Sequence, residues 1–303
     1  MPYRAILCPT DHSACAEAAL AYGAEVAVHH EAAVHTLFVE PPRLPGASTD
    51  FAMQAAVLQP VEEAAYEAQT FSQDAGDIAH AILAYVEAHP IDLVVMGTAG
   101  RRGVDRFILG SVAETLVREA PCPVATVNRH IAWRKQEATG ITVAPVDFSS
   151  ANFEVLRRAA QLVQMERGTL HLVHVCEAQV LPSAEAVYAA VDTTVYLKEA
   201  AQRRLQEWTE ALQEDTGLPA GQVRPVIETG GASEQILAYA TRTGADRIVL
   251  ATHGRSGWRR FLLGSVAERV VRRAPCPVIT FGPAALDHAG DAVPPAEDVQ
   301  SSA

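Results

Sequence analysis

An internal repeat constrains the fold of this 303-residue chain more than any other feature. Residues Asp92–Val127 align with Asp246–Phe281 without a gap, and 22 of the 36 positions are identical. The offset there is 154 residues, whereas an offset of 136 residues relates the earlier parts and pairs Asp11 with Asp147. The chain therefore contains two copies of one unit, and the second copy carries an 18-residue insertion in its middle.

The repeat predicts two domains, residues 1–130 and residues 137–282, each large enough to bury a hydrophobic core of its own. Their boundary lies in a polar, unpatterned stretch at residues 128–140. Residues 283–303 are rich in Ala, Pro, Asp and Ser and contain four acidic residues and no Lys or Arg. We expect a flexible acidic tail there.

Each copy alternates short apolar runs with longer helical patterns, which is typical of a parallel sheet built from β-α-β units and covered by helices on both faces. We therefore predict an α/β fold of two tandem, doubly wound, Rossmann-like sheets. In the first copy the expected strands are Arg4–Pro9, Ala33–Val39, Glu67–Ser72, Leu93–Met96 and Val124–Val127, and the expected helices are Ser13–Val28, Ile78–Ala88 and Ser111–Glu119. In the second copy the expected strands are Ile141–Pro145, Thr169–Val175, Gln222–Glu228, Arg247–Leu250 and Val278–Phe281, and the expected helices are Phe153–Gln164, Glu234–Arg242, Ser265–Arg273 and one that the insertion lengthens within Ser183–Glu214.

Charge and composition narrow the class of protein. The chain has 24 Lys and Arg against 36 Asp and Glu, a net charge of −12, which argues against extended nucleic acid and anionic membranes as partners. Neither a secretion signal nor a run of 18 apolar residues is found in the sequence, so we expect a cytoplasmic protein. The five cysteines are scattered without a CxxC pair, which favours reduced structural thiols over a metal or redox site.

A glycine-rich segment follows the fourth expected strand of each copy. In the first copy, Gly97 and Gly100 are followed after nine residues by Gly110 and Ser111, at the start of an expected helix. Glycines let a backbone approach a ligand closely, and free N–H groups at a helix start attract phosphate oxygens. Ser111 is suited to be the N-cap or to donate its hydroxyl to a phosphate. The alternative is that the glycines only turn the chain and the serine only caps the helix.

The spacing recurs in the second copy, where Gly254 is followed after nine residues by Gly264 and Ser265. Positive charge gathers in both segments: residues 97–111 carry +2 and residues 251–265 carry +3, so the rest of the chain carries −17. The arginines concerned are Arg101, Arg102, Arg106, Arg255, Arg259 and Arg260. Basic loops at the carboxyl ends of strands favour a compact anion as ligand, the alternative being a solvated arginine face.

A carboxylate follows the first expected strand of each copy, in Pro9–Asp11 and in Pro145–Asp147. Such a carboxylate commonly caps the next helix, and Ser13 and Ser149 stand nearby. The other interpretation is that it accepts hydrogen bonds from a ribose or a base, as acidic groups do at this edge of nucleotide-binding folds.

At these residues the chain resembles the universal stress protein family in its tandem two-domain form. The resemblance covers nearly all of residues 3–282, and its most specific part is the motif GxxGx9G[S/T], which the first copy matches in full. It implies a five-stranded parallel sheet of order 3-2-1-4-5 in each copy, pairing of the two fifth strands within the chain, and binding of ATP, or of ADP or AMP, with or without Mg²⁺. The binding residues that it implies are Pro9, Thr10, Asp11, Val39, Gly97, Gly100, Arg101, Gly110, Ser111 and Val112 in the first copy, and Pro145, Val146, Asp147, Val175, Ala251, Gly254, Arg255, Gly264, Ser265 and Val266 in the second.

The resemblance implies that Asp11 contacts the ribose and that the backbone of Val39 contacts the adenine. It also implies that the glycine segment with Ser111 holds the phosphates. The second copy departs from the motif because Ala251 replaces its first glycine. We therefore expect the first site to match the motif better and the two sites to bind adenine nucleotide with unequal affinity.

These patterns favour a nucleotide-binding module with little or no turnover, without catalytic or metal-binding residues, and the resemblance implies a role in the stress response. The sequence contains no GxxxxGK[ST], SGGxDS or HxGH loop of the common nucleotide-hydrolysing or nucleotide-transferring enzymes. Slow ATP hydrolysis is an alternative, with Asp11, Asp147 or His253 as the general base. Another is an interaction module without bound nucleotide. We also expect the whole chain to form a homodimer.

Overall fold

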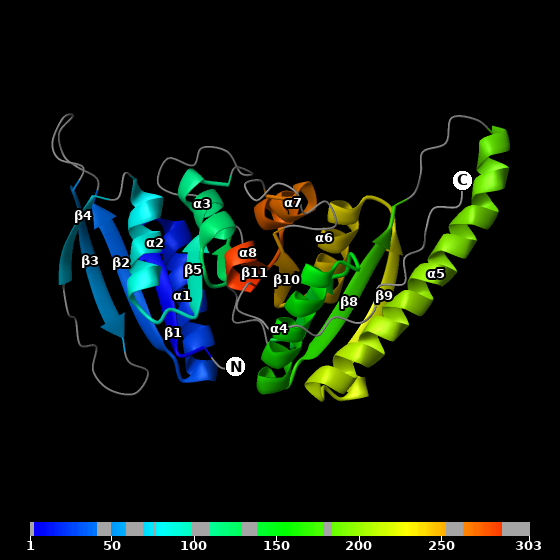
Figure 1. Cartoon of the computed structure of the whole chain (residues 1–303), viewed down its shortest axis with the longest axis horizontal. Coiled ribbons are helices and arrows are strands. Elements are labelled where there is room, and N and C mark those ends of the chain that lie inside the picture. The colour runs from blue at the N-terminus through cyan, green and yellow to red at the C-terminus, as the bar shows by residue number, and fades with distance from the viewer. Residues whose placement is uncertain are drawn as a thin grey trace.

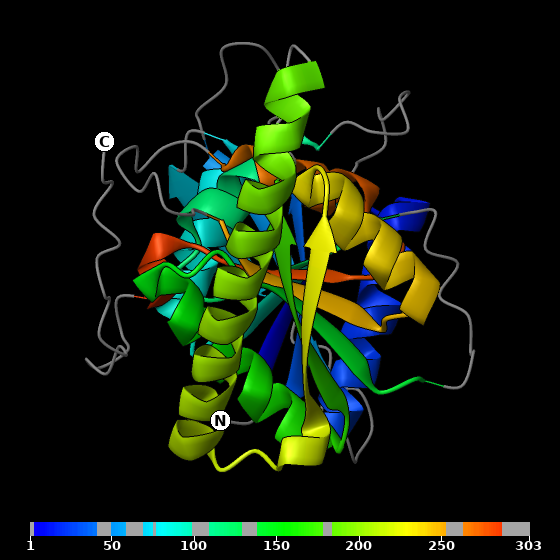
Figure 2. The ribbon, with the colours of Figure 1, turned by 90° about the vertical axis from the view of Figure 1, so that its right-hand side faces the viewer.

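The computed structural model describes residues 3–40, 50–58, 69–74, 77–98, 109–128, 138–177, 184–252 and 263–286. The two copies form one continuous 11-stranded sheet in the order β4-β3-β2-β1-β5-β6-β11-β10-β7-β8-β9 (Figure 1). Helices cover both faces of this twisted sheet (Figure 2). The predicted α/β doubly wound fold is confirmed.

The first copy contains β1 (Ala5–Thr10), α1 (Ala14–His30), β2 (Ala33–Glu40), β3 (Asp50–Leu58), β4 (Gln69–Asp74), α2 (Ile78–Ala88), β5 (Leu93–Gly97), α3 (Ser111–Glu119) and β6 (Val124–Val127). The second copy contains β7 (Ile141–Pro145), α4 (Ser150–Glu166), β8 (Thr169–Cys176), α5 (Ala184–Thr216), the short 3-10 helix η1 (Ala220–Gln222), β9 (Val223–Thr229), α6 (Ala232–Thr243), β10 (Arg247–Ala251), α7 (Ser265–Arg273), β11 (Val278–Phe281) and α8 (Pro283–Leu286).

The second copy has the predicted topology. Its strands are all parallel and lie in the order β9-β8-β7-β10-β11, which is 3-2-1-4-5 in chain order within the copy. A parallel connection needs a crossover segment, and the 33-residue helix α5, which the insertion lengthens, supplies it between β8 and β9.

The first copy departs from the predicted five-stranded parallel sheet. Strand β3 lies between β2 and β4 and runs antiparallel to both. The expected third strand, Glu67–Ser72, exists as β4, but β3 separates it from β2, so the predicted order is wrong for this copy. The physical reason is that its shorter middle contains a returning strand, and an antiparallel strand needs no crossover helix.

Two hydrophobic cores cover the two faces of the sheet. Side chains alternate along β5, so Val94 and Met96 join a core with α2, α3, α6 and α7, while Leu93 and Val95 join a core with α1, α4 and α5. Each core contains residues of both copies. The copies are therefore joined by shared cores as well as by the sheet.

Strands β6 and β11 join the two copies in the middle of the sheet, where they pair antiparallel. The Thr126 Oγ1 donates to the Val278 carbonyl over 3.2 Å, and the Thr280 Oγ1 donates to the Val124 carbonyl over 3.0 Å. Since Thr126 and Thr280 are equivalent in the repeat, these reciprocal bonds relate the copies by an approximate twofold axis. The predicted pairing of the fifth strands within one chain is confirmed.

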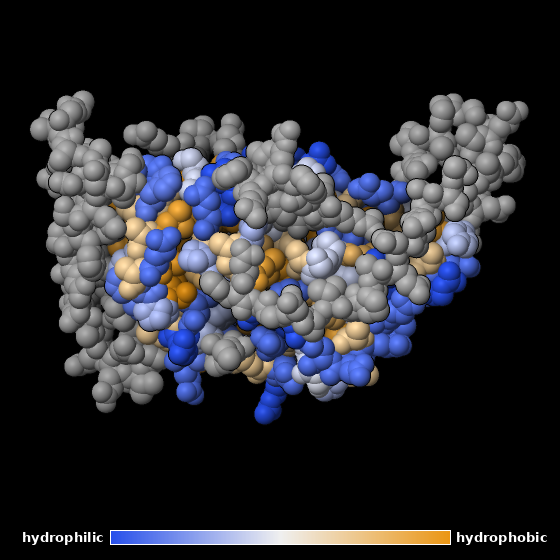
Figure 3. All heavy atoms as spheres, in the orientation of Figure 1, coloured by the Kyte–Doolittle hydropathy of each residue, from blue (hydrophilic) through white to orange (hydrophobic). Residues whose placement is uncertain are grey.

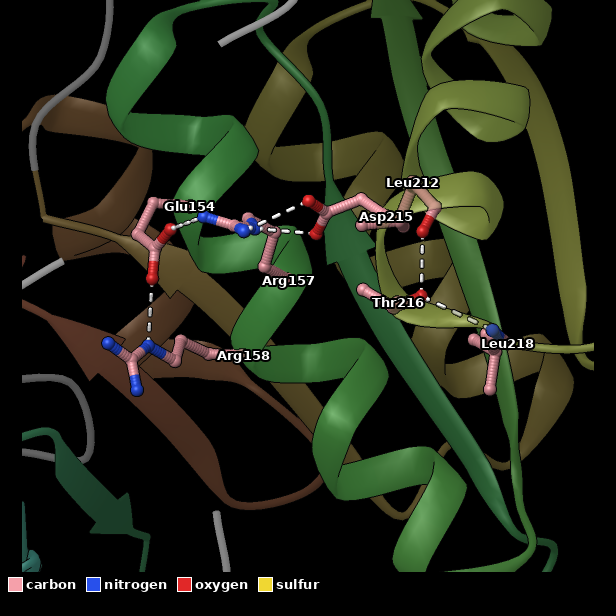
Figure 4. Close-up of polar contacts among 7 residues, drawn as sticks. All are labelled: Glu154, Arg157, Arg158, Leu212, Asp215, Thr216 and Leu218. Atoms are coloured by element: carbon pink, nitrogen blue, oxygen red, sulfur yellow. Dashed lines mark hydrogen bonds and ion pairs between the residues drawn. The ribbon is translucent and has the colours of Figure 1, made fainter. Parts of the chain in front are cut away.

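Helix α5 is fixed to the second copy through its C-terminal half. Leu205, Trp208 and Leu212 are buried there, whereas the outer side is hydrophilic (Figure 3). Near its end, Asp215 accepts two hydrogen bonds from Arg157 of α4, at 2.7 and 2.9 Å (Figure 4). Such a bidentate pair fixes the relative orientation of the two helices.

Despite its length, α5 is not apolar enough to cross a membrane, and neither is any other helix within the described ranges. At the C-terminus, α8 begins in the segment predicted to be a flexible tail, and its Ala285 and Leu286 pack against the core formed with α1, α4 and α5. The rest of that predicted tail, residues 287–303, lies outside the described residues.

Candidate functional site

The sheet separates at its carboxyl edge between β1 and β5. Their register joins Ile6 to Leu93 and Leu7 to Val94, although both strands continue three residues further. Pro9 lacks the N–H group that a longer ladder would use. In the second copy β7 and β10 also share only two register pairs. In open α/β sheets, ligands bind beside such a reversal of strand order.

The two predicted carboxylates stabilise the turns that follow β1 and β7. Asp11 Oδ1 accepts a hydrogen bond from the Ser13 N–H at 3.0 Å, and Asp147 Oδ1 accepts from the Ser149 N–H at 2.9 Å and its hydroxyl at 2.7 Å. The serines are the N-caps of α1 and α4, so the carboxylates support the caps rather than form them. Contact with a ribose stays a prediction.

Glycine caps the helix on the other side of each site. Gly110 is the N-cap of α3 and Gly264 that of α7, whereas Ser111 is the first helical residue, so the prediction of Ser111 as N-cap is wrong. The glycine N–H groups donate to the carbonyls of Thr98 and Thr252 at 2.8 and 2.9 Å. Because glycine has no side chain to accept from the first-turn N–H groups, these donors suit an anion.

Gly110 and Gly264 also lie close to the preceding strand ends. A Cβ at Gly110 would lie 3.4 Å from the Thr98 carbonyl oxygen, and one at Gly264 would lie 3.2 Å from that of Thr252. Neither glycine has a positive φ, so the backbone conformation does not require glycine. The close approach favours glycine at Gly264, whereas a Cβ at Gly110 would make an ordinary contact.

Gly97 has a packing role that the motif alone does not reveal. A Cβ there would lie 2.7 Å from the Cys15 Sγ. In the second copy the equivalent residues are Ala251 and Ala151, so the sulfur that a Cβ at Gly97 would meet is absent there. The presence of Ala251 instead of glycine in the second copy is consistent with this packing difference.

The structure brings the described binding candidates to one edge of the sheet, at the ends of the strands or the start of the next helix. They are Pro9, Thr10, Asp11, Val39, Gly97, Gly110, Ser111 and Val112 in the first site, and Pro145, Val146, Asp147, Val175, Ala251, Gly264, Ser265 and Val266 in the second site. The remaining candidates lie outside the described residues, and so do the other loop arginines and one candidate base: Gly100, Arg101, Arg102, Arg106, His253, Gly254, Arg255, Arg259 and Arg260.

A comparison with models of protein families shows which family the chain is related to. The model described as "Universal stress protein family" matches residues 2–128 and again residues 140–281. The chain belongs to the universal stress protein family. The prediction from its motifs, including the tandem form, is confirmed.

Curated relatives agree with this assignment. Universal stress protein Rv2005c of Mycobacterium tuberculosis (strain ATCC 25618 / H37Rv) is 31% identical over 196 residues, which are 62% of this chain and 61% of that relative. Universal stress protein MJ0531 of Methanocaldococcus jannaschii is 28% identical over 137 residues, 45% of this chain and 78% of that relative. The chain thus matches less than two thirds of the length of Rv2005c.

Solved structures share the fold over nearly the whole chain. A universal stress protein from Archaeoglobus fulgidus DSM 4304 has a TM-score of 0.60 at 22% identity, covering 91% of this chain and 95% of that one. A putative universal stress protein from Pseudomonas aeruginosa UCBPP-PA14 has a TM-score of 0.59 at 19% identity, covering 92% and 93%. At such identities the likeness shows the fold alone.

Two polar residues of this universal stress protein contact the second site, and neither was predicted from the sequence. The Asn152 Nδ2 donates to the Pro145 carbonyl at 2.9 Å, and His174 Nδ1 lies 2.7 Å from the Val146 carbonyl. The repeat could have identified them, because these two positions are polar in the second copy, whereas the first copy has Ala16 and Phe38 there. Among the described residues there is no group of three or more His, Cys, Asp or Glu side chains that could hold a metal.

Proposed function

We propose that this universal stress protein binds an adenine nucleotide, ATP foremost, in each copy and acts as a regulatory module with little or no turnover. One observation carries the proposal. In both copies the separated strands stand beside a helix whose first-turn N–H groups have a glycine N-cap with no side chain to accept from them. Uncapped donors at a helix start suit phosphate oxygens. The +2 and +3 charges of the two loop segments favour the same ligand.

The remaining candidates suit the other parts of a nucleotide. Asp11 and Asp147, at the ends of β1 and β7, would accept hydrogen bonds from ribose hydroxyls. The backbones of Val39 and Val175, near the ends of β2 and β8, would contact the adenine. Any Mg²⁺ would enter with the phosphates, because its usual partners are phosphate oxygens and water.

The state of the two carboxylates favours binding over hydrolysis. A general base must be free to take a proton from the attacking water. Asp11 Oδ1 already accepts one hydrogen bond within its turn, and Asp147 Oδ1 accepts two. A carboxylate oxygen that is held within the turn is less available to take that proton. Slow hydrolysis is therefore the less favoured function.

The position of the fifth strands bears on the predicted homodimer. Both β6 and β11 have partners on each side within the sheet. A second chain would have to use another surface, such as the outer strand β4 or β9. The homodimer itself stays a prediction, as does a cytoplasmic stress-response role without nucleic acid.

Replacing Gly110 with Asp is expected to reduce the ATP bound per chain from two to one. The new carboxylate would stand at the helix start, where it repels phosphate and accepts the first-turn N–H groups itself. Gly264→Asp should have the same effect on the second site. Isothermal titration calorimetry on the full chain measures both.

The matched control is Gly221→Asp, since a Cβ at Gly221 meets nothing within 4 Å and the position lies in η1. This variant should retain two ATP per chain. If Gly110→Asp also retained two, the assignment of the first site would be wrong.

Single-turnover measurements with excess protein are expected to show bound ATP persisting unhydrolysed. Rapid mixing, quenching and chromatography of the nucleotide separate ATP from ADP. A clear chemical step, abolished by Asp147→Ala or Asp11→Ala, would instead support the slow ATPase.

A further inference from the structure

The turn after β7, residues 145–149, is fixed by a side chain that the first copy lacks. Asn152, in the first turn of α4, is 4% exposed. Its Nδ2 donates to the Pro145 carbonyl at 2.9 Å and its Oδ1 accepts from the Asp147 N–H at 3.3 Å. Asn152 therefore restrains the backbone on both sides of Val146 and sets the position of the Asp147 carboxylate.

His174 fixes the residue between them. Its Nδ1 lies 2.7 Å from the Val146 carbonyl oxygen, and since a carbonyl can only accept, this nitrogen carries the proton and donates. The Val146 N–H donates in turn to the Val173 carbonyl at 2.8 Å. Both backbone polar groups of Val146 are thus engaged by β8.

An aromatic cluster anchors the next residue of the turn. Phe148 has a left-handed backbone with φ of 61°, a conformation that is unfavourable for a residue with a Cβ. Its buried ring packs against His174 at 4.5 Å and Trp208 at 5.4 Å between centroids, and the Arg204 guanidinium lies 4.7 Å above it. Because α4 and α5 are tied together by Arg157 and Asp215, this cluster is held in place.

The equivalent turn of the first copy has different chemistry. Ala16 stands in place of Asn152 and Phe38 in place of His174, and neither side chain can form a hydrogen bond. His12, the equivalent of Phe148, has the same left-handed backbone with φ of 59° but is exposed. The first-site turn has contacts of its own, since the His12 N–H donates to Thr10 Oγ1 at 3.0 Å and the His12 ring lies 5.0 Å from that of Phe38. It lacks the two hydrogen-bonding side chains and the buried ring that restrain the second turn.

We propose that Asn152 and His174 are positioning residues which preorganise Asp147, so that the second site binds ATP more tightly than the first. The inference rests on the proposed function. A site whose polar groups are already fixed loses less conformational entropy on binding. The sequence predicts unequal affinities and a better match to the motif in the first site, whereas the contacts of this turn favour the second site.

Site-specific affinities test the proposal on the full chain. Asp11→Ala leaves the second site as the ATP site, and Asp147→Ala leaves the first. We expect calorimetry to give a Kd about tenfold lower for the second site than for the first. Asn152→Ala and His174→Phe, which introduce the first-copy residues, should each raise the second-site Kd about tenfold and leave the first-site Kd unchanged.

A spectroscopic readout separates positioning from a general loss of stability. In chains labelled with 5-fluorotryptophan, the ¹⁹F resonance of Trp208 is assigned with Trp208→Phe and reports on Phe148. ATP should shift this resonance little in the wild-type chain and more in Asn152→Ala, where the turn becomes ordered only on binding. Tyr239→Phe is the control, because it removes the 2.9 Å contact of Tyr239 with buried His171 on the other face of β8. It should leave both Kd values unchanged.

Equal Kd values for the two sites, or no change of the second-site Kd in Asn152→Ala, would overturn the inference while leaving the proposed function intact. If neither the Asp11→Ala nor the wild-type chain bound ATP, the proposed function would fail and the inference with it. An equal loss of affinity in Tyr239→Phe and Asn152→Ala would also contradict it, since destabilisation alone would then explain the effect.

Discussion

Replacing Glu166 with Ala is expected to lower the free energy of unfolding by about 3–5 kcal/mol, because it leaves a buried arginine charge without its partner. Both terminal nitrogens of Arg247 donate to the two carboxylate oxygens of Glu166. The side chains are only 12% and 16% exposed. Arg247 begins β10 and Glu166 ends α4, so the pair ties a helix to the sheet.

The same carboxylate also contacts the first copy. Glu166 Oε1 lies 3.6 Å from the Nε2 of His30, whose side chain is fully buried at the end of α1. The Tyr3 N–H donates to His30 Nδ1 at 3.1 Å, so the proton of a neutral His30 is on Nε2 and faces Glu166. Loss of Glu166 should therefore loosen the junction between the copies as well as the second copy itself.

Urea unfolding measures the loss, and Glu268→Ala is the matched control. The pair of Glu268 with Arg272 is more exposed, with side chains 39% and 36% exposed, so its removal should cost less than about 1 kcal/mol. If the two variants lost the same free energy, Glu166 would not be a buried structural partner.

The contribution of Glu166 should depend on pH. Burial opposes its charge, but Arg247 and His30 outweigh that effect and lower the pKa of Glu166 from its ordinary 4.5 to about 2. Because its pKa is lower in the folded state, the Glu166 carboxylate contributes its full stabilisation of the folded chain above pH 4.5. This contribution is lost as the pH falls towards 2. The stability difference between wild type and Glu166→Ala should therefore shrink over this range in urea titrations at successive pH values. A difference that does not vary with pH would contradict the account.

Replacing Gly97 with Ala is expected to destabilise the chain by about 1–3 kcal/mol through overpacking. Its methyl would lie 2.7 Å from the Cys15 Sγ and 3.0 Å from the Cys15 backbone carbon. Adding Cys15→Ala should restore part of the stability, since the double variant recreates the Ala151 and Ala251 of the second copy. Recovery is incomplete because the backbone carbon and Cβ of residue 15, both 3.0 Å from the new methyl, remain in Cys15→Ala. The Sγ contact with the Val127 carbonyl at 3.3 Å is also lost.

A double-mutant cycle in urea isolates this coupling. The Gly97→Ala effect should be smaller in the Cys15→Ala background than in wild type, with a coupling energy of about 1 kcal/mol. Additive effects would mean that the glycine serves something other than packing against Cys15.

Much of the architecture could be predicted from the repeat. It located the candidate residues at the carboxyl ends of strands in both copies, and the resemblance to the universal stress protein family implied the pairing of the fifth strands. Short apolar runs bounded by turn residues have few possible assignments other than the buried strands of a parallel sheet. The same reasoning failed at β3, because residues 50–58 (DFAMQAAVL) combine good helix formers with an apolar pattern that a strand can also use.

Other features depend on contacts that no local pattern encodes. Aligning the copies puts His30 and Glu166 at one position, and Arg247 where Leu93 is buried in the first copy. The alignment therefore shows that the second copy has a charged residue, Arg247, at a position that is buried in the first copy. It does not show that Glu166 is its partner, because the two side chains meet only in the folded chain. Likewise Gly110 rather than Ser111 became the N-cap, because the position of the helix start is fixed by the contact of Gly110 with Thr98.

Each copy of the repeat should hold one adenine nucleotide. Equilibrium dialysis of the intact chain against labelled ATP, with and without excess inorganic tripolyphosphate, measures this. We expect two ATP per chain, and we expect tripolyphosphate to compete more weakly than unlabelled ATP, because the strand ends contribute contacts to the adenine and ribose. No bound ATP, or equal competition by tripolyphosphate, would contradict it.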